Sequence, residues 1–588
     1  MTERARTTER TQTGIERDGE HRWERSDTIW SLALALIATV TAAVLSSTVF
    51  GRIPHVQDSI AQLFQARIFA GGHLTAPAPA LPEFFAYHHM ILADGRWYSQ
   101  YPPGHALSLL IGVVLHAPWL VNPVLGGVAV FATYFLGMET LGRPAARLGA
   151  SLALVSPFLL LMSAEFMAHA TTLATLTLFL ALQLQALRTG SRFAAWASAL
   201  LLAWGVLARP YSALGFTIPV AILALWNLRK GAPARQTLVA LGVGGVLGGA
   251  LLLAYNAGTT GDPFLFGYEK LYGPSHGLGF GKGTWGPPHT LARGLLGFVR
   301  QIGDLHHRLF EWPVGSLWLL LVGLLPGLLW GRRLFLVSIP LSLGFVHVFY
   351  WYRDGCFGPR YWYEGLAPML LLTAVGMLRI RDALRRVWLR IARVPTTRRD
   401  PKGSGGTRRR RNDTSVPATS SVATASLSVP AAAPSRTPAT AADWISGGAL
   451  AVLILSGLVW GWPALFRPPA FAVGQPPESA YRQASYFAYF GPQYWGVGPY
   501  LGSLVDSQVS ERAIVFCSFV EEPIDEISVR YLWFGSAFAH EVPYLDRARV
   551  IYARDLGDRD QELIARYPDR AAYRYTGTIQ AGSLQPLR

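Results

Sequence analysis

Ionisable side chains that could act on an anionic substrate occur at three places in this sequence, each beside an apolar run. Asp58 lies in IPHVQDSIAQLFQARIFAGGHL, residues 53–74, directly after the first such run. A positioned carboxylate can take a proton from a hydroxyl as a general base. Arg209 in LARPYSAL and Arg360 in CFGPRYWYEGLAP each carry a guanidinium, which binds phosphate through paired hydrogen bonds. These residue types suggest a base and two anion-binding groups, although an arginine at a membrane surface can also extend to lipid headgroups.

Asp58 stands at the start of a helical pattern, and two roles are open for it. The apolar residues of this pattern fall on one helical face: Ile60, Leu63, Phe64 and Ile68. An aspartate before a helix commonly caps its first free N–H groups. From its position alone the cap is favoured, but Asp58 could also be a general base held at the membrane surface, and the two roles are compatible. Its neighbours His55 and Gln57 are expected to contact the substrate.

A long segment rich in His, Tyr and Trp follows, and its core is HHMILADGRWYSQYPPGHALSLL, residues 88–110. Two prolines fix an entry turn into the next helix, and Gly104 allows a close approach of the chain. The alternative is a rigid connector without a ligand. Loops of this length are usually functional or disordered, and the aromatic content argues against disorder. The residues expected to contact a substrate are His88, His89, Tyr98, Tyr101 and His105.

Glu165 and His169 in SAEFMAHATTL are four residues apart, which places both on one face of a continuous helix. They could be part of a metal site, but no third ligand is evident, so we favour polar lining of a cavity. The stretch 255–291 is dense in Gly, Pro and aromatic residues and contains Glu269. It suits a sugar ring or an isoprenoid chain, or it is a connector without a ligand. Tyr211 and Tyr361, beside the two arginines, complete the expected substrate contacts.

The amino-acid composition indicates that these residues belong to a membrane protein. Of the 588 residues, 51% are hydrophobic and only 15% are charged, whereas a soluble domain carries about 25% charged residues. Apolar runs long enough to cross a bilayer recur along the chain. The net charge of +16 comes largely from arginine clusters near the N-terminus and at 379–411, which are typical of cytoplasmic segments. We therefore do not expect a nucleic-acid partner.

The distribution of basic residues also predicts the topology. If the apolar stretch 105–119 enters the membrane without crossing it, Arg143 and Arg147 fall on the cytoplasmic side, where the N-terminus lies. All later basic clusters then also fall on the cytoplasmic side. We expect an α-helical polytopic membrane protein with about eleven to twelve transmembrane helices. The predicted segments are a basic cytoplasmic N-terminus (1–27), a transmembrane catalytic module (28–380), a basic disordered linker (381–442), a last transmembrane helix (443–463) and a small extracytoplasmic α/β domain (467–588).

Cysteine and histidine chemistry gives little further guidance. Cys356 and Cys517 are the two cysteines, and the sequence leaves open whether they form a disulfide or remain thiols. No cluster has the spacing of a metal site. No cofactor is expected, and a requirement for a divalent metal stays open.

As a set, these motifs resemble the GT-C superfamily of integral-membrane glycosyltransferases, most closely the family 39 protein O-mannosyltransferase and aminoarabinose-transferase type. The resemblance covers residues 28–380. It depends on the order and spacing of HVQDSIAQLFQARIFAGG, YPPGH, SAEFMAHATTLATLTLFLAL, LARPYSAL and FGPRYWYEGLAPMLLL. The C-terminal domain and the arginine-rich linker lie outside it.

The resemblance implies a polyprenyl-phosphate sugar as donor and an inverting attack by an acceptor hydroxyl. It implies that Asp58 is the base, that Arg209 lies near the donor phosphate, and that His169 lies at a polar position of the pocket that is often an acid in relatives. Many relatives have two adjacent acids, whereas Ser59 follows Asp58 here, which puts the role of the second acid in doubt. Glu165 is a candidate substitute.

The expected function is therefore transfer of a sugar from a polyprenyl-phosphate donor to a hydroxyl of a glycan, lipid or protein acceptor. The expected location is the outer face of a bacterial cytoplasmic membrane. Two alternatives stay open. A lipid-linked sugar flippase or transporter would leave the donor intact, and a catalytically inactive anchor for the C-terminal domain would not need Asp58.

Overall fold

A computed structural model describes residues 23–284, 286–325, 331–352, 357–392, 441–461, 497–519, 534–578 and 581–587. The basic N-terminal segment through residue 22, Cys356 and most of the expected linker lie outside these ranges. The chain divides into two compact units, one formed by residues 1–378 and 453–588 and the other by residues 379–452. The first unit carries the site and is described below.

Six described helices are long and apolar enough to cross a membrane: Arg25–Thr48 (α2), Pro118–Thr140 (a 3₁₀ turn and α5, Val121–Thr140), Ala168–Thr189 (α8), Ala232–Thr260 (α11), Arg332–Phe349 (α15, Arg332–Val346, and a 3₁₀ turn) and Arg360–Val387 (the 3₁₀ turn Arg360–Gly365 and most of α16, Leu366–Ala392). A seventh crossing is the pair α6 (Arg143–Ala153) and α7 (Pro157–Ala164), which are bent by 57°. Ser156 and Pro157 separate the two, and Ser156 caps α7 through the N–H of Leu159.

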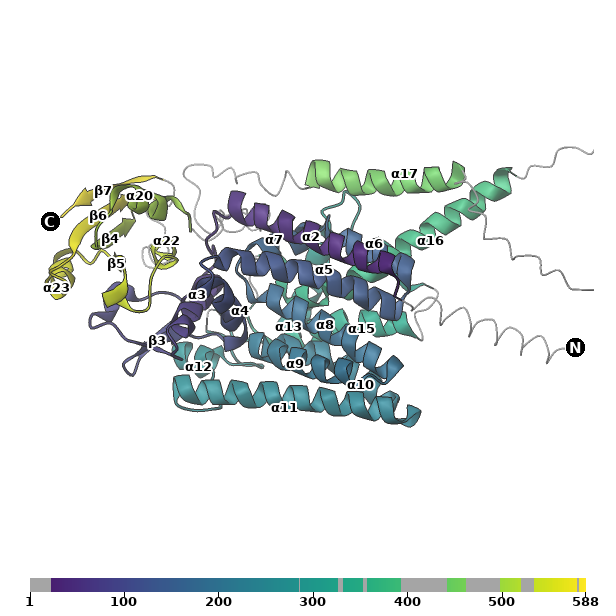
Figure 1. Cartoon of the computed structure of the whole chain (residues 1–588), viewed down its shortest axis with the longest axis horizontal. Helices are drawn as coiled ribbons and strands as arrows, with labels where there is room; N and C mark the ends of the chain where they lie inside the picture. The colour runs from purple at the N-terminus through teal and green to yellow at the C-terminus, as the bar shows by residue number, and fades with distance from the viewer. Residues whose placement is uncertain are drawn as a thin grey trace, which may run out of the picture. The chain divides into compact units, whose positions relative to one another are not determined.

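Three apolar helices are shorter: α4 (Pro103–Val114), α9 (Arg192–Ala208) and α10 (Pro210–Trp226). Figure 1 shows most of these helices side by side in one bundle, with α13 (Leu291–Arg308) among them. Helix α14 (Leu317–Leu324) ends close to residues 326–330, which lie outside the described ranges. The described part of the chain thus has fewer long spans than the eleven to twelve expected, because α9 and α10 have only 17 residues each.

Ion pairs at one end of the bundle indicate whether α4 crosses it. Asp27, at the start of α2, is fully buried and accepts hydrogen bonds from Tyr134 and Arg143, at 2.8 and 2.9 Å. Arg147 lies 3.3 Å from the same carboxylate. Arg143 and Arg147 are therefore at the same end of the bundle as the start of α2, as expected if α4 does not cross.

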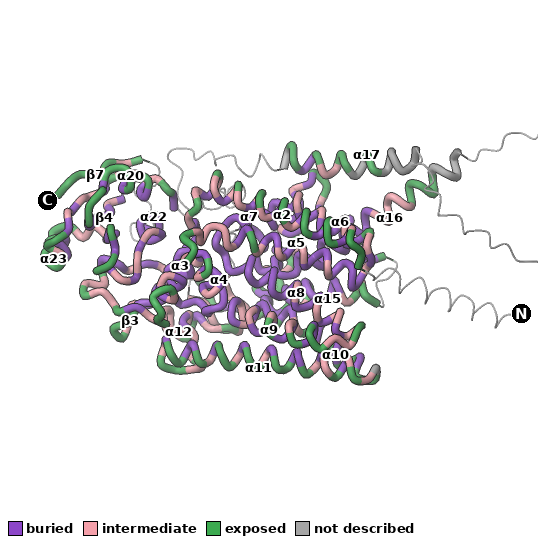
Figure 2. The backbone as a smooth tube through the Cα atoms, viewed as in Figure 1, coloured by how far each residue is buried: buried purple, intermediate pink, exposed green. Residues whose placement is uncertain are grey.

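Apolar side chains cover the outside of the bundle. Exposed large apolar residues recur along α2 and α11: Leu32, Leu36, Val40, Val44, Val239, Val243, Val246 and Leu251. Figure 2 shows exposed residues along both helices, while α5 and α8 are mostly buried. A helix that exposes this much apolar surface is suited to contact with lipid.

The segment after α2 forms a small layer of structure at the end of the helical bundle opposite Asp27. Helix α3 (Gln57–Ala70) is followed by β1 (Ala76–Pro77), β2 (Met90–Ala93) and β3 (Arg96–Ser99), which form an antiparallel sheet in the order β1-β3-β2. Asp94 and Gly95 join β2 to β3 with φ angles of 54° and 70°, the left-handed conformation that a tight hairpin turn requires. This hairpin leads into Gln100, Tyr101 and α4.

The C-terminal region is an α/β domain. Its sheet has the order β5-β4-β6-β7, with β4 (Ala513–Phe519) parallel to β5 (Val550–Arg554) and β6 (Ala571–Gly577), and β7 (Gly582–Pro586) antiparallel to β6. The described helices are α20 (Tyr500–Gln508), α22 (Gly535–Phe538) and α23 (Asp560–Arg566). The sequences of β4 and β6 are AIVFCSF and AAYRYTG, and that of α23 is DQELIAR. Cys517 is a free buried thiol.

One hydrophobic core joins this domain to α3. Phe64 of α3, Trp97 of β3 and Phe538 of α22 belong to the same buried cluster, and the rings of Phe64 and Phe538 are 5.3 Å apart. Arg67 of α3 donates to the backbone carbonyls of Glu541 and Ala539, at 2.7 and 2.9 Å. The C-terminal domain therefore packs directly on the helix that carries Asp58.

The predicted start of a disordered linker at residue 381 is wrong. Helix α16 (Leu366–Ala392) continues past it, because Ile380, Leu384, Val387 and Ile391 recur at helical spacing. In the second unit, α17 (Ala441–Ser456) starts where the last transmembrane helix is expected, and a π-helical turn, Gly457–Gly461, follows it.

Candidate active site

A cavity of about 880 Å³ opens beside Asp58. It is lined by the start of α3, by the residues just before α4, by the junction between α9 and α10, by the loop 264–278, and by the segments around His347 and Arg360. It lies at the end of the bundle opposite the Asp27 cluster. Segments far apart in the sequence therefore meet where the apolar bundle ends.

Asp58 lies in the first turn of α3, where its carboxylate contacts two groups. Arg360 Nη1 lies 3.3 Å from Asp58 Oδ2, and the hydroxyl of Tyr101 donates to Oδ1. Burial alone would raise the pKa of this carboxyl, but the Arg360 charge and the hydrogen bonds from Tyr101 and Arg360 lower it to about 2. Asp58 is therefore ionised at neutral pH.

Two expectations about this helix are wrong. The N-cap of α3 is Val56, and no side chain caps it, so Asp58, two residues further along, is the second residue inside the helix and does not act as the cap. Helix α3 is also not an amphipathic helix with one wet face, because Gln57, Gln62 and Gln65 are buried together with its apolar residues. The C-terminal domain and the hairpin cover the face that would otherwise be exposed.

Arg209 ends α9 and precedes α10, and it faces the cavity rather than lipid. Its Nε lies 3.0 Å from Glu364 Oε1 and donates to Ser212 Oγ at 3.3 Å. His169 Nδ1 lies 2.9 Å from the same Glu364 oxygen. Glu364, which does not line the cavity, thus fixes the Arg209 side chain by this ion pair. Arg209 itself is part of the cavity wall. Arg209 and Arg360 both lie beside the Tyr361 ring, at 6.0 and 5.5 Å from its centroid.

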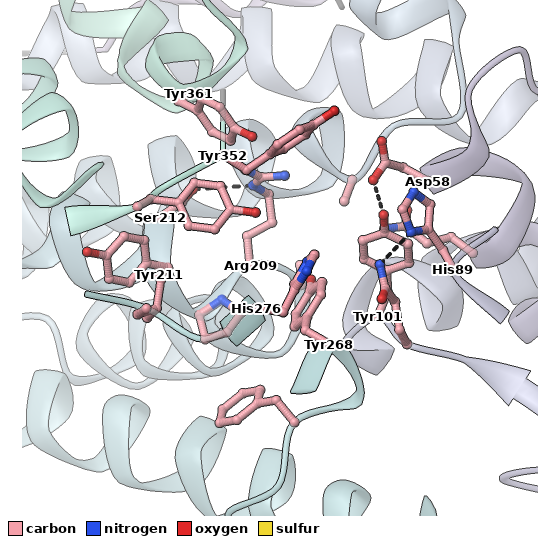
Figure 3. Close-up of a pocket in the computed structure, with 18 of the residues that line it drawn as sticks. Asp58, His89, Tyr101, Arg209, Tyr211, Ser212, Tyr268, His276, Tyr352 and Tyr361 are labelled. Atoms are coloured by element: carbon pink, nitrogen blue, oxygen red, sulfur yellow. Dashed lines mark hydrogen bonds between the residues drawn. The ribbon is translucent and has the colours of Figure 1, made fainter. Parts of the chain in front are cut away.

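The carboxylate of Asp58 and the guanidinium of Arg209 lie on opposite sides of the cavity. Figure 3 shows Asp58, His89 and Tyr101 on one side, and Arg209, Tyr211, Ser212 and Tyr361 on the other. Tyr268 and His276, from the loop 264–278, lie between them. The cavity therefore offers a carboxylate across from a cationic wall, with aromatic rings between the two.

The histidines at the cavity are neutral at physiological pH. Burial lowers the pKa of His88 to about 3 and that of His276 to about 4. Burial also lowers the pKa of His89, and the nearby Asp58 charge only partly opposes this. The His276 ring stacks on Tyr272 at 4.7 Å. The loop 264–278 therefore contributes rings and not charge, apart from Glu269.

Glu165 and His169 do not share a helical face, contrary to the expectation. Helix α7 ends at Ala164 and α8 begins at Ala168, so the chain breaks between them. Glu165 accepts from the His55 N–H and from Ser59 Oγ, both at 2.7 Å. Neither Glu165 nor His169 is part of the cavity lining. Both support, from behind, the residues that do line it.

Three more expected contacts also lie outside the lining. His55 bonds the carbonyls of Val497 and Phe50, at 2.9 and 2.7 Å. His105 bonds Thr171 Oγ1 and the Phe166 carbonyl, both at 2.7 Å, and Tyr98 is buried in the core beneath the sheet. The expected residues that do line the cavity are Gln57, Asp58, His88, His89, Tyr101, Arg209, Tyr211, Glu269, Arg360 and Tyr361.

Several lining residues were not expected: Gln62, Gln100, Ser212, Tyr268, His276, His347, Tyr350 and Tyr352. Gln62 follows Asp58 by four residues, so the helical period alone places it on the same face. Tyr268 and His276 depend on how the loop folds back, and no local pattern signals that.

No group of three His, Cys, Asp or Glu side chains that could hold a metal ion occurs within the described ranges. Arg360 instead supplies the positive charge beside Asp58.

No model of a known protein family matches this chain, and no curated protein matches it. Among solved structures, ArnT from Cupriavidus metallidurans bound to undecaprenyl phosphate is similar over 93% of both chains, with 11% identity and a TM-score of 0.48. The archaeal oligosaccharyltransferase AglB from Archaeoglobus fulgidus, in complex with an inhibitory peptide and a dolichol-phosphate, is similar over 94% of this chain and 70% of its own, with 12% identity and a TM-score of 0.39.

Proposed function

We propose that this protein is a membrane glycosyltransferase that moves a sugar from a polyprenyl-phosphate donor to an acceptor hydroxyl. The observation that carries the proposal is the placement of an ionised carboxylate, Asp58, across one cavity from Arg209 at the end of an apolar helical bundle. Such a cavity suits a donor whose chain stays in lipid while its phosphate reaches the bundle end. The donor class is the one that the sequence resemblance implies.

The residues divide the reaction between two sides of the cavity. Asp58 accepts the proton of the acceptor hydroxyl while that oxygen forms its bond to the anomeric carbon. The bond from the anomeric carbon to the phosphate oxygen breaks on the opposite face, and its electron pair leaves with polyprenyl phosphate. Arg209, across the cavity from Asp58, stabilises the charge that grows on this leaving group. Attack from the side opposite the leaving group inverts the anomeric configuration.

The surroundings of the charged groups support this assignment. Glu364 and Ser212 fix Arg209, and Tyr101 fixes Asp58, so little reorganisation is needed when charge develops. We further propose that the site is on the extracytoplasmic side of a bacterial cytoplasmic membrane, because the basic end of the bundle is suited to the cytoplasmic side.

The test is release of polyprenyl phosphate by purified protein in lipid nanodiscs, with a panel of radiolabelled polyprenyl-phosphate sugars. Asp58→Asn keeps the shape of the side chain and removes the base. We expect the rate to fall about 100-fold or more. Asp94→Asn, in the exposed hairpin turn, is the matched control and keeps the wild-type rate. Equal rates for Asp58→Asn and the wild type would overturn the base assignment, and movement of intact donor across the bilayer would indicate a flippase.

A further inference from the structure

Among the described residues, two acidic side chains line the cavity, Asp58 and Glu269. Asp58 is paired with Arg360. The Glu269 carboxylate has no hydrogen bond and no ion pair to any residue in the described part of the chain, and the neighbouring Lys270 pairs with Asp94 instead, at 2.8 Å. Glu269 therefore brings a negative charge to the cavity wall that no protein group balances directly.

The oxygens of this carboxylate are open to a ligand. The Glu269 side chain is half-buried. Several side-chain oxygens and nitrogens of the described chain are fully buried without a partner, and neither Glu269 oxygen is among them. Both oxygens thus retain accessible surface, and because Glu269 is part of the cavity lining, a molecule in the cavity can donate hydrogen bonds to them.

Gly277, which also lines the cavity, leaves the space that this carboxylate occupies. A Cβ at Gly277 would come within 2.3 Å of Glu269 Oε1. The φ and ψ angles of Gly277 are −67° and 176°, a conformation that any residue adopts, so the backbone itself does not require glycine here. The missing side chain instead makes room for the carboxylate at the cavity wall.

The short helix α12 (Gly267–Tyr272) carries Glu269 and is held by the segment that leads into α4. A Cβ at Gly267 would come within 2.4 Å of the Gln100 carbonyl oxygen, so the two backbones are in direct contact. At the other end of the helix, the Tyr272 hydroxyl accepts the His89 N–H at 3.4 Å. These contacts fix the position of Glu269 in the absence of a ligand.

Glu269 is also close to the place where the transferred sugar must lie. In the proposed reaction the anomeric carbon lies between the base and the arginine that binds the phosphate, and Tyr268 and His276 lie between these two groups (Figure 3). Glu269 directly follows Tyr268, and its Oε1 packs against Gly277, which directly follows His276. The carboxylate therefore belongs to the part of the wall that faces the sugar.

We propose that Glu269 determines which sugar is transferred, by accepting hydrogen bonds from two neighbouring hydroxyl groups of the donor's sugar ring. The proposal rests on the proposed function, because it names a donor contact in that same site. A carboxylate has two acceptor oxygens and no donor, and hydrogen bonds to a charged acceptor are stronger than those between neutral groups. Two neighbouring hydroxyls present two donors side by side, which matches this geometry.

The aromatic rings beside Glu269 favour hydroxyl groups over an ammonium group. A cation is bound by ring faces that are open to it. The rings of Tyr268 and Tyr272 both stack on His276, with centroids 6.3 and 4.7 Å apart and interplanar angles of 8° and 27°. These faces are turned towards one another. An amino sugar would therefore meet the carboxylate without an aromatic cage, whereas hydroxyls need only the carboxylate.

The first experiment measures binding of undecaprenyl-phosphate glucose, galactose, mannose and arabinose to the full-length protein in nanodiscs, with undecaprenyl phosphate alone as the comparison ligand. We expect one of these donors to bind and Glu269→Ala to weaken it about 10- to 100-fold, as loss of hydrogen bonds to a charged acceptor would. The affinity for undecaprenyl phosphate should not change, because this ligand has no sugar. Equal weakening of both ligands, or of neither, would overturn the proposal.

Glu83→Ala is the matched control for this experiment. Glu83 lies in the 3₁₀ turn Pro82–Phe85, its side chain is exposed, and it does not line the cavity. Its replacement should leave both affinities unchanged. The melting temperature of Glu269→Ala should equal that of the wild type, because the carboxylate has no protein partner to lose. A decrease that accompanies weaker binding of both ligands would assign Glu269 to folding and overturn the proposal.

Deoxy forms of the best donor identify the hydroxyls. Removal of one contacted hydroxyl should weaken binding to the wild type about tenfold and should have little effect on Glu269→Ala, because the partner of that hydroxyl is already gone. Additive losses at every ring position would overturn the contact. Tighter binding of amino-deoxy forms that Glu269→Gln abolishes would show that an ammonium group is bound and would overturn the assignment to hydroxyls.

Gly277→Ala tests the placement of the carboxylate without removing it. The new methyl group should displace Glu269 Oε1, so the variant should bind the sugar donor more weakly and undecaprenyl phosphate normally. In the Glu269→Ala background the same change should add nothing. A further loss in that background would show that Gly277 acts on the loop and would overturn the placement of the carboxylate.

Release of polyprenyl phosphate separates this proposal from the proposed function. Normal cleavage of every donor by Glu269→Ala, with no change in the preferred sugar, would overturn the role of Glu269 and leave the enzyme assignment in place. Binding of sugar donors that depends on Glu269, in a protein that cleaves none of them, would overturn the enzyme and support the sugar contact.

Discussion

Arg360 Nη1 lies 3.3 Å from Asp58 Oδ2, and this pair links α3 to the 3₁₀ turn Arg360–Gly365 just before α16, 302 residues along the chain. Asp58 would have a raised pKa from burial alone, and the guanidinium is the main reason that the pKa is about 2 instead. Because the folded pKa lies below the ordinary value, the pair stabilises the fold above pH 4 and loses this effect as the pH falls towards 2. The same pair keeps Asp58 ionised but weakly basic.

Arg360→Gln should therefore move the acid limb of the activity profile to higher pH. Without the guanidinium, burial dominates and the pKa of Asp58 rises, so kcat falls as the pH is lowered from 8 to 4. The wild-type profile should be flat over this range as far as Asp58 is concerned. The measurement is kcat against pH at saturating donor. Arg360→Lys keeps a positive charge and should shift the limb less, and superimposable profiles for Arg360→Gln and wild type would contradict this role.

Glu165 is the second acid near Asp58, and it should affect stability rather than turnover. Burial raises its pKa to about 7, and the hydrogen bonds from His55 and Ser59 offset this only in part. The folded pKa lies above the ordinary 4.5, so the folded state loses stability as the pH rises from about 4.5 through 7. Glu165→Gln removes this penalty and should stabilise the protein above pH 7 by on the order of 2–3 kcal/mol.

The measurement is the free energy of unfolding, or the melting temperature where unfolding is irreversible, at pH 5 and pH 8. Glu165→Gln should match the wild type at pH 5 and exceed it at pH 8, with turnover still dependent on Asp58. A loss of activity comparable to that of Asp58→Asn, with stability unchanged at both pH values, would assign the base to Glu165 instead.

The sequence singled out Asp58, Arg209 and Arg360, which line one cavity, because each of them breaks a strong local rule. Arg209 and Arg360 interrupt apolar runs at the end of the bundle that lacks the basic clusters, and Asp58 follows the first span directly. These residues meet in one cavity because successive crossing helices run in opposite directions. The prediction that α4 does not cross put Asp58, Arg209 and Arg360 at the same end of the bundle.

What the sequence did not predict depends on contacts between distant segments. Glu364 was passed over, although it joins Arg209 to His169, because a single acid beside an arginine carries no pattern. The break between Glu165 and His169 was missed because the apolar period continues through it. The Asp94-Gly95 turn was a usable signal for the hairpin that leads to Gln100, and it was not used.

The last prediction concerns the contact between α3 and the C-terminal domain. Arg67 donates to the carbonyls of Glu541 and Ala539, and burial raises the pKa of Glu541 to about 8. At neutral pH the guanidinium is therefore held mainly by backbone oxygens. Arg67→Leu should destabilise the protein by about 2–4 kcal/mol, since each hydrogen bond to a charged donor contributes about 1.5–3 kcal/mol.

Because α3 also carries Asp58, loss of the Arg67 hydrogen bonds should also lower the rate of the catalysed reaction. We expect kcat for Arg67→Leu to fall while the KM for donor stays near the wild-type value, since Arg209 lies across the cavity from Asp58 and is held by Glu364. Arg67→Lys restores one donor and should recover part of kcat, which a general loss of folded protein would not produce. Arg512→Leu, which removes an exposed pair with Asp569 on the same domain, is the control and should leave kcat unchanged. An equal fall in kcat for Arg67→Leu and Arg67→Lys, or none for either, would show that the domain does not position Asp58.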